Sequence, residues 1–268
     1  MNLIKGPTGR TRLYPLFGDP IIYVRSPEFF TRGMIARGQD AMCIPMEVSD
    51  HALDPFMKGI SVVPNVDGLL ITMPHKFNAF TYCATGSETS KRLNVVSVMR
   101  RNADGSWHGD MLDGDAFVKA QIDHGAKPGG AKALLLGAGG AGSAIAISLL
   151  QAGVRELIIH DVSAERVDRL LETIADLAGG RARAGDADPT GCDMVCNATP
   201  MGMDGKDPLP VDASLLRPTM FVGDVIAGHD ETPLLRAARE AGCGTANGDH
   251  MVEAVQTIML DFMLNRSA

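Results

Sequence analysis

Short apolar runs and amphipathic stretches alternate along the second half of the chain. Continuous apolar runs are typical of buried parallel strands, whereas apolar residues at intervals of three and four indicate a helix. The pattern predicts strands at residues 131–136, 156–160, 193–196 and 219–224, and helices at 143–152 and 167–177. Strands that alternate with helices in this way predict a doubly wound α/β unit between about residues 115 and 240.

The first hundred residues show the same alternation with less regularity. Strands are predicted at 13–17, 41–45 and 68–72, a helix at 27–37, and a turn at 73–76. A Met- and Leu-rich amphipathic stretch at 251–264 predicts a final helix that packs back on this first part. We therefore expect an α/β fold of two domains. The first comprises residues 1–114, completed by the C-terminal helix at 249–268, and the second comprises residues 115–248.

The composition narrows the classes of protein to which the chain can belong. Its 268 residues carry 32 acidic against 25 basic side chains, a net charge of −7, which argues against a nucleic-acid-binding protein. No apolar run approaches the roughly 18 residues of a transmembrane helix, and the N-terminus lacks the apolar segment of a signal peptide. The five cysteines are scattered, as expected of free thiols in the cytoplasm, and their spacing indicates no metal site. We expect a small molecule as partner, neither nucleic acid nor membrane, and a monomer or homodimer as the assembly.

A glycine-rich segment joins the predicted strand 131–136 to the predicted helix 143–152. In this G-x-G-x-x-G pattern Gly137 permits a tight turn, Gly139 lets the backbone approach a pyrophosphate, and Gly142 lets helix and strand pack closely. The unpaired N–H groups of the helix N-terminus then attract the anion. The segment between a strand and a helix therefore predicts a dinucleotide-binding domain; a plain glycine-rich turn is the alternative.

The residue that ends the next predicted strand bears on the choice of dinucleotide. Asp161 follows Gly142 by 19 residues, where an acid that hydrogen-bonds the adenosine ribose is expected. Its carboxylate would repel a 2′-phosphate, and no Arg or Lys occurs at 161–163. Arg166 is the only nearby cation, and we expect it to face outward from its helix. The sequence therefore favours NAD over NADP.

Other short motifs accompany this segment along the whole chain. They are Gly18-Asp-Pro-Ile21 with Ser26-Pro27, Thr72-Met-Pro-His-Lys76, Gly109-Asp110 with Asp113-Gly114, Gly137-Ala-Gly-Gly-Ala141, Asn197-Ala-Thr-Pro-Met-Gly-Met203, Thr232-Pro-Leu-Leu235, and Gly248 with Met251. In this order they resemble the shikimate dehydrogenase family. The resemblance implies an N-terminal substrate domain, a Rossmann-type domain and an NAD(P)-dependent oxidoreductase that acts on an alcohol or ketone.

The resemblance also implies roles for individual residues. Lys76 and Asp113 stand where the family has a lysine and an aspartate beside the reacting alcohol. Loss of a hydride from an alcohol requires loss of the hydroxyl proton, and a lysine can exchange that proton if burial or a neighbour tunes its pKa. A plain salt bridge between two loops is the alternative. The implied substrate-binding residues are Ser26, Thr72 and Gln256. The implied cofactor-binding residues are Gly137, Ala138, Gly139, Gly140, Ala141, Gly142, Asp161, Asn197, Thr199, Met201, Val225 and Gly248.

The chain departs from the family at the positions that bind shikimate. Apolar residues replace the family's serine, asparagine, threonine, tyrosine and glutamine side chains. They are Val24, Leu70, Val96, Met111, Leu112, Ala227 and Val255, the last with Gln256 one residue later. Each lost hydrogen bond costs on the order of 1–3 kcal/mol, so we expect a small, cyclic hydroxy-carboxylate other than shikimate as substrate. Two alternatives remain: an authentic shikimate or quinate dehydrogenase with compensating contacts, and a regulatory protein that binds a dinucleotide without turnover.

Two histidines close to these motifs are weaker candidates for the site. His75 precedes Lys76 and either touches a ligand or lies on a surface loop. His250 replaces a glycine that is common in the family, and it either reaches the ligand or packs locally.

Overall fold

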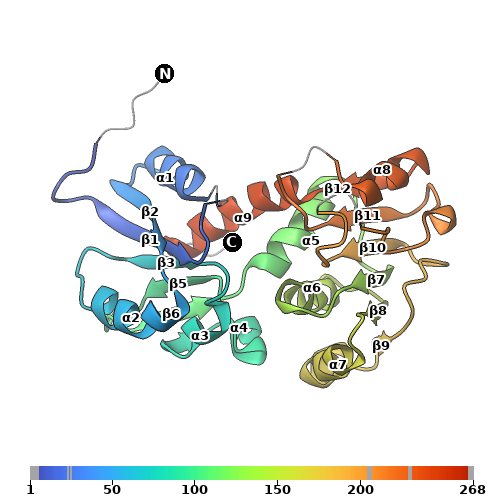
Figure 1. Cartoon of the computed structure of the whole chain (residues 1–268), viewed down its shortest axis with the longest axis horizontal. Coiled ribbons are helices and arrows are strands. Elements are labelled where there is room, and N and C mark those ends of the chain that lie inside the picture. Colours follow the sequence, from blue (N-terminus) through green and yellow to red (C-terminus); the bar gives the residue numbers. More distant parts are fainter. Residues whose placement is uncertain (1–5, 23, 25, 204–206, 229–230, 265–268) are drawn as a thin grey trace. The chain divides into compact units, whose positions relative to one another are not determined.

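The computed structural model describes residues 6–22, 24, 26–203, 207–228 and 231–264. The chain forms two compact units, each with its own sheet (Figure 1). The first unit comprises Met1–Leu112 with Gln256–Ala268, and the second comprises Asp113–Val255.

A six-stranded mixed sheet forms the centre of the first unit. Its elements are β1 (Arg12–Gly18), α1 (Ser26–Ala36), β2 (Ala41–Glu47), the 3-10 turn η1 (Asp50–Ala52), α2 (Leu53–Ser61), β3 (Gly68–Ile71), α3 (Lys76–Phe80), β4 (Cys83–Gly86), α4 (Glu88–Leu93), β5 (Val98–Arg101) and β6 (Trp107–Asp110). The strand order is β2-β1-β3-β5-β6-β4, in which β1 runs parallel to β2 and β3 while β5 is antiparallel to β3 and β6. The strands and the helix predicted before residue 72 are confirmed.

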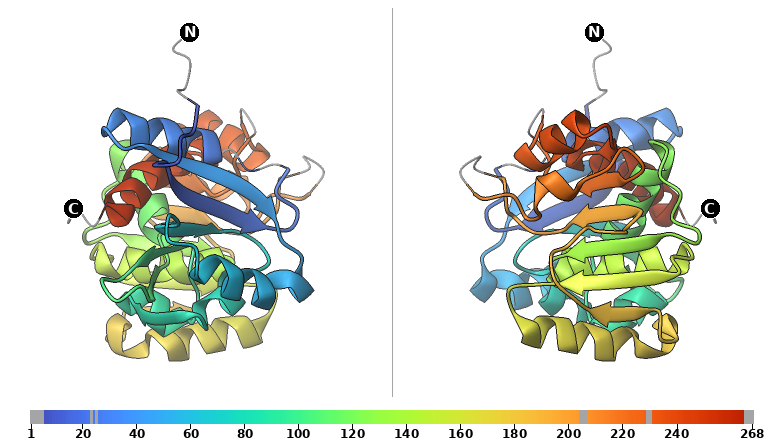
Figure 2. Two further views of the ribbon diagram at one scale, coloured as in Figure 1. Left: turned by 90° about the vertical axis from the view of Figure 1, so that its left-hand side faces the viewer. Right: turned by 90° about the vertical axis from the view of Figure 1, so that its right-hand side faces the viewer.

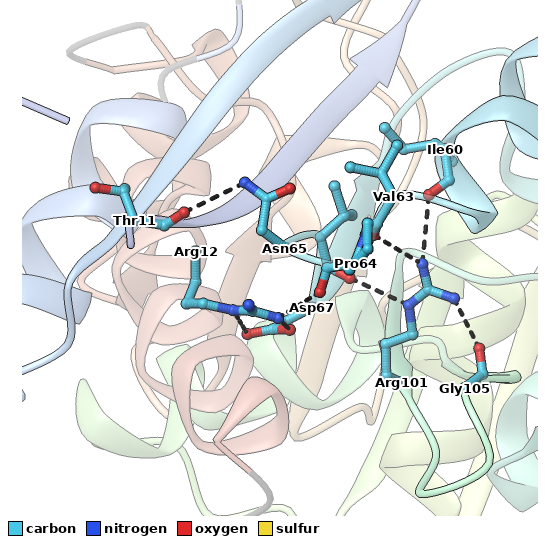
Figure 3. A network of polar contacts seen from close by, with 10 residues as sticks. Thr11, Arg12, Ile60, Val63, Pro64, Asn65, Asp67, Arg101 and Gly105 are labelled. Carbon is cyan, nitrogen blue, oxygen red and sulfur yellow. Dashed lines mark hydrogen bonds and ion pairs between the residues drawn. The ribbon is translucent and has the colours of Figure 1, made fainter. Parts of the chain in front are cut away.

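Two arginines form hydrogen bonds that hold the loop between α2 and β3, as Figure 3 shows. Arg12 donates through Nε and one terminal nitrogen to the two oxygens of the Asp67 carboxylate, and to the carbonyl of Pro64 at 2.8 Å. Arg101 donates to the carbonyls of Gly105 at 2.7 Å and Ile60 at 3.3 Å. These bonds satisfy carbonyl groups in the last turn of α2, in the loop after it and in the β5–β6 turn, and they hold the start of β3, whose other end carries the Thr72 motif.

The second unit is a parallel sheet covered by helices. Its elements are α5 (Asp113–Asp123), β7 (Lys132–Leu136), α6 (Gly140–Gln151), β8 (Glu156–His160), α7 (Ala164–Ala178), β9 (Ala182–Ala184), β10 (Met194–Asn197), η2 (Ala213–Leu215), β11 (Phe221–Asp224), α8 (Pro233–Glu240), β12 (Gly244–Ala246) and α9 (Gly248–Met263), of which the last part belongs to the first unit. The strand order is β12-β11-β10-β7-β8-β9, which the right-hand view of Figure 2 shows from one edge to the other. The predicted doubly wound unit is confirmed. The order reverses at β7, so ligands are expected at the carboxyl ends of the strands around β7 and β10.

The C-terminal part of α9 packs on the first unit. Leu260 contacts Gly33 in α1, Met263 lies against Gly68 in β3, and Asp261 pairs with Arg37 at 3.1 Å. None of the helices in the described part of the chain is long and apolar enough to cross a membrane.

We predict that the Thr31 hydroxyl joins α1 to β2 and contributes to stability. It donates to the Pro27 carbonyl at 2.7 Å and accepts the buried N–H of Cys43 at 2.9 Å. Thr31→Val keeps the shape but leaves that N–H without an acceptor, so the free energy of unfolding should fall by about 1–2 kcal/mol. Thr31→Ser keeps the hydroxyl and should lose less, as measured by urea denaturation. A larger loss for Thr31→Ser would show that the methyl group matters more than the hydrogen bonds.

Candidate functional site

The glycine-rich segment forms the turn between β7 and α6. Gly137 has a left-handed φ of +97°, and its N–H donates to the His160 carbonyl at 2.7 Å. A Cβ on Gly142 would overlap the Gly137 carbonyl, whereas one on Gly139 would meet no atom within 4 Å. The turn is therefore tight at Gly137 and Gly142 and open at Gly139, beside the N-terminus of α6, which no side chain of the described residues caps. These residues fit a dinucleotide pyrophosphate, which needs backbone donors and close approach.

Asp161 follows β8 and binds the same turn. One carboxylate oxygen accepts from Ala138 N at 2.8 Å and the other from Ser163 N at 2.9 Å, and only 6% of its side chain is exposed. Arg166 lies 3.7 Å from this carboxylate while 59% of its side chain is exposed, so it faces solvent as expected but also pairs with Asp161. The first turn of α7 brings residue 166 back over the strand end, because Ser163 caps that helix. The next residue after Asp161, Val162, is 94% exposed and apolar.

Residues of β10 and the following loop form a hydrogen-bonded network. The Asn197 side-chain oxygen accepts from the Thr199 N–H at 3.1 Å and from its hydroxyl at 2.6 Å, and the Thr199 oxygen accepts from Met201 N at 3.2 Å. Val225 donates its N–H to the Asn197 carbonyl at 3.0 Å, and Gly248 donates to the Ile226 carbonyl at 3.1 Å. Four of the predicted cofactor residues thus lie at or just after the carboxyl ends of β10 and β11, and Gly248 packs beside them.

The first unit places Thr72 and Lys76 in one turn after β3. Thr72 donates its N–H to the Phe17 carbonyl of β1 at 3.0 Å, and Asp19 donates to the Met73 carbonyl at 2.9 Å. Lys76 begins α3, is half-buried, and accepts from Val96 N at 3.0 Å through its carbonyl. Ser26 begins α1, the helix that follows β1. Thr72 and Lys76 therefore follow the carboxyl end of β3, and Ser26 follows that of its parallel neighbour β1.

His75 is a buried anchor of that turn, so a position on a surface loop is wrong. Its side chain has no exposed surface, and Nε2 lies 2.5 Å from the Val48 carbonyl. A carbonyl only accepts, so Nε2 carries the hydrogen. Nδ1 is buried and has no hydrogen bond to the residues that the structure describes; it lies 3.9 Å from a carboxylate oxygen of Asp50. The imidazole thereby ties the backbone before Lys76 to the loop after β2.

Asp113 and Gln256 lie where the two units begin and end. Asp113 is the first residue of α5 and of the second unit, directly after Leu112, whose N–H donates to the Ser97 hydroxyl at 2.9 Å. Gln256 opens the part of α9 that belongs to the first unit. Its Nε2 is buried and has no hydrogen bond among the described residues, whereas Val255 offers no polar atom. An unpaired buried donor points to Gln256 as the member of this pair able to take a polar ligand.

The apolar replacements divide into two groups. Leu70, Val96, Met111 and Leu112 are at most 3% exposed, and Val96 belongs to the core cluster around Phe17. Val24 and Val255 are half-buried, and Ala227 is exposed. The first group therefore contributes to the packed interior. The motifs in the sequence do not distinguish the buried replacements from the more exposed ones, because burial depends on residues that are distant along the chain.

Ser97 was not singled out from the sequence. Its side chain is buried and binds the Leu112 N–H, which precedes Asp113. A serine at the end of an apolar run, Val95-Val96, was the available signal.

His250 stacks on another histidine. Its ring lies 3.7 Å from that of His124, which follows α5, and burial together with His124 lowers the pKa of His250. His250 thus packs locally. Cys196, in β10, is also inert because burial raises the pKa of its thiol to about 12. Among the described residues, no three His, Cys, Asp or Glu side chains gather as a metal site.

Comparisons with known proteins identify relatives of this chain. A family model described as the shikimate dehydrogenase substrate binding domain matches residues 16–99. A protein of Rubrobacter xylanophilus named shikimate dehydrogenase (NADP(+)) is 34% identical over 250 residues, which are 91% of this chain and 87% of that protein.

Solved structures share the fold over almost the full length. The shikimate 5-dehydrogenase of Listeria monocytogenes, in complex with shikimate and NAD, matches with a TM-score of 0.90 at 27% identity, over 99% of this chain and 96% of that one. The ligand-free 5-ketofructose reductase of a Gluconobacter strain matches with a TM-score of 0.88 at 26% identity, over 97% of this chain and 95% of that one.

Proposed function

Because this chain belongs to the shikimate dehydrogenase family and is an NAD(P)-dependent oxidoreductase, we propose that it interconverts a secondary alcohol and a ketone on a small hydroxylated substrate other than shikimate. One observation carries the choice of substrate. Positions that the family fills with hydrogen-bonding side chains hold Leu70, Val96, Met111 and Leu112, and all four are buried. A triol carboxylate would find too few partners there. The similarity to a 5-ketofructose reductase supports the proposal, since that relative's name places a keto sugar on the same fold.

Lys76 would act as the acid and base of the reaction. The bound nicotinamide supplies the hydride acceptor or donor. As the alcohol is oxidised, Lys76 Nζ accepts the hydroxyl proton, and in the reverse direction it returns that proton to the carbonyl oxygen. Asp113 would orient the lysine and the hydroxyl, while Ser26, Thr72 and Gln256 would bind the remaining polar groups of the substrate. The half-buried position of Lys76 and its tied backbone support this role.

Two other functions compete with this proposal. The relative from Rubrobacter xylanophilus is named a shikimate dehydrogenase, which favours authentic turnover of shikimate or quinate with compensating contacts. The second competing function is that of a regulatory protein that binds a dinucleotide without turnover. This function does not account for the retained Lys76 and Asp113.

We predict that the protein does not oxidise shikimate or quinate efficiently. The missing hydrogen bonds should raise KM by orders of magnitude. Initial rates should be measured with both cofactors against shikimate, quinate and a panel of hydroxy acids and keto sugars. A KM for shikimate at or below about 1 mM would contradict the proposed substrate, because typical enzymes reach that range with their own substrates.

Lys76→Met should reduce kcat by about 100-fold or more on any substrate found in that panel. The loss is that of general acid–base catalysis, since methionine has similar length and no proton to exchange. Lys91→Met is a matched control on the exposed face of α4, where Lys91 pairs with Glu88 at 3.2 Å, and it should leave the rate unchanged. An unchanged kcat for Lys76→Met would remove the lysine from the mechanism.

We also propose that NAD is preferred over NADP, although the relative from Rubrobacter xylanophilus is named for NADP(+). The carboxylate of Asp161 would repel a 2′-phosphate, and the exposed Val162 beside it offers no positive charge. Arg166, 3.7 Å from Asp161, pairs with that carboxylate.

Calorimetry should therefore give a lower Kd for NAD than for NADP. Val162→Arg should shift the ratio toward NADP by about tenfold, because a charge-assisted bond to phosphate is worth roughly 1.5–3 kcal/mol. Val162→Gln is the uncharged control. Tighter binding of NADP by the unmodified protein would overturn this preference.

A further inference from the structure

The strand order decides which strand ends face each half of a bound dinucleotide. The pyrophosphate turn follows β7, and Asp161 at the end of β8 marks the adenosine side. In a doubly wound sheet the ligand crosses the point where the strand order reverses. The nicotinamide half therefore extends over the carboxyl ends of β10 and β11, which lie on the other side of β7 from β8.

A fully buried carboxylate lies beneath those two strand ends. Asp224 ends β11 and has no exposed surface. One oxygen accepts from Asn197 Nδ2 and from Ile226 N, each at 3.1 Å, and the other accepts from the Thr232 hydroxyl at 2.7 Å. Asn197 is its register partner on β10.

These bonds join three segments of the chain: the end of β10, the backbone after β11 and the start of α8. Through Asn197 the carboxylate orients the loop after β10, because the Asn197 oxygen is then free to accept from Thr199. Through Ile226 it turns the backbone after β11. Through Thr232 it positions the start of α8, since the same hydroxyl accepts Leu235 N as the helix cap.

We infer that Asp224 is a positioning residue for the nicotinamide half of the cofactor. It touches neither ring nor substrate, and acts by fixing the loops that carry Asn197, Thr199 and Val225. An amide at this position has one acceptor oxygen in place of two, so at least one of the three donors loses its partner. The loops then lose a common anchor, while the turn after β7 and Asp161 keep theirs. The inference rests on the placement of the nicotinamide half and not on the identity of the substrate.

The test compares a ligand that reaches these loops with one that does not. Kd is measured by calorimetry for NAD+ and for ADP, which lacks the nicotinamide riboside. Asp224→Asn should weaken NAD+ by about tenfold or more and leave the Kd of ADP within about twofold. Asp161→Ala, on the adenosine side, should weaken both ligands. Asp212→Asn removes an exposed cap of η2, where Asp212 accepts from Ser214 N at 2.9 Å, and should change neither.

A second pair of variants covers the case in which Asp224→Asn does not fold. Thr232→Val removes one bond to Asp224, and Thr232→Ser restores it. Thr232→Val should weaken NAD+ selectively, and Thr232→Ser should recover it. Parallel losses for NAD+ and ADP would show a general structural role and overturn the inference, as would unchanged binding of both. Because no substrate is needed, failure to find a substrate for the enzyme leaves this result unaffected.

Discussion

Backbone groups at the ends of parallel strands have no further strand residue to pair with, and the structure depends on how side chains satisfy them. Asp161 accepts the N–H of Ala138 from a neighbouring strand's loop, and Asp224 accepts the N–H of Ile226 together with two side-chain donors. A buried carboxylate is stable only with such donors. The same bonds that make the charge tolerable also set the conformation of the loops. The loops at this edge of the sheet are therefore held by side chains that are largely covered by protein.

In the first unit, buried side chains hold the backbone of the loops in a similar way. His75 joins the turn before Lys76 to Val48, and Ser97 holds the N–H of Leu112. Both side chains are buried and belong to the interior. They restrict the backbone from which Lys76 and Asp113 extend. A lysine in the proposed acid–base role would need such a restricted position, since small displacements are costly in catalysis.

The apolar replacements have a double consequence. Leu70, Val96 and Met111 are buried in the first unit, at positions that correspond to polar side chains of the family. Buried apolar area stabilises the fold at about 25 cal/mol per Å². The same side chains offer no hydrogen bond to a ligand, which is the basis of the substrate proposed above.

The sequence by itself determined the doubly wound unit, the glycine turn and the order of the motifs, because strand and helix periodicity and the needs of a tight turn are local properties of the chain. It also indicated Lys76 and Asp161 through their motifs. The tertiary structure decided the rest: that His75 is buried, that Arg166 lies beside Asp161, that His250 stacks on His124, and that Asp224 joins three segments. These facts depend on contacts between residues far apart in sequence, and no periodicity along the chain encodes which distant partner a polar side chain will meet.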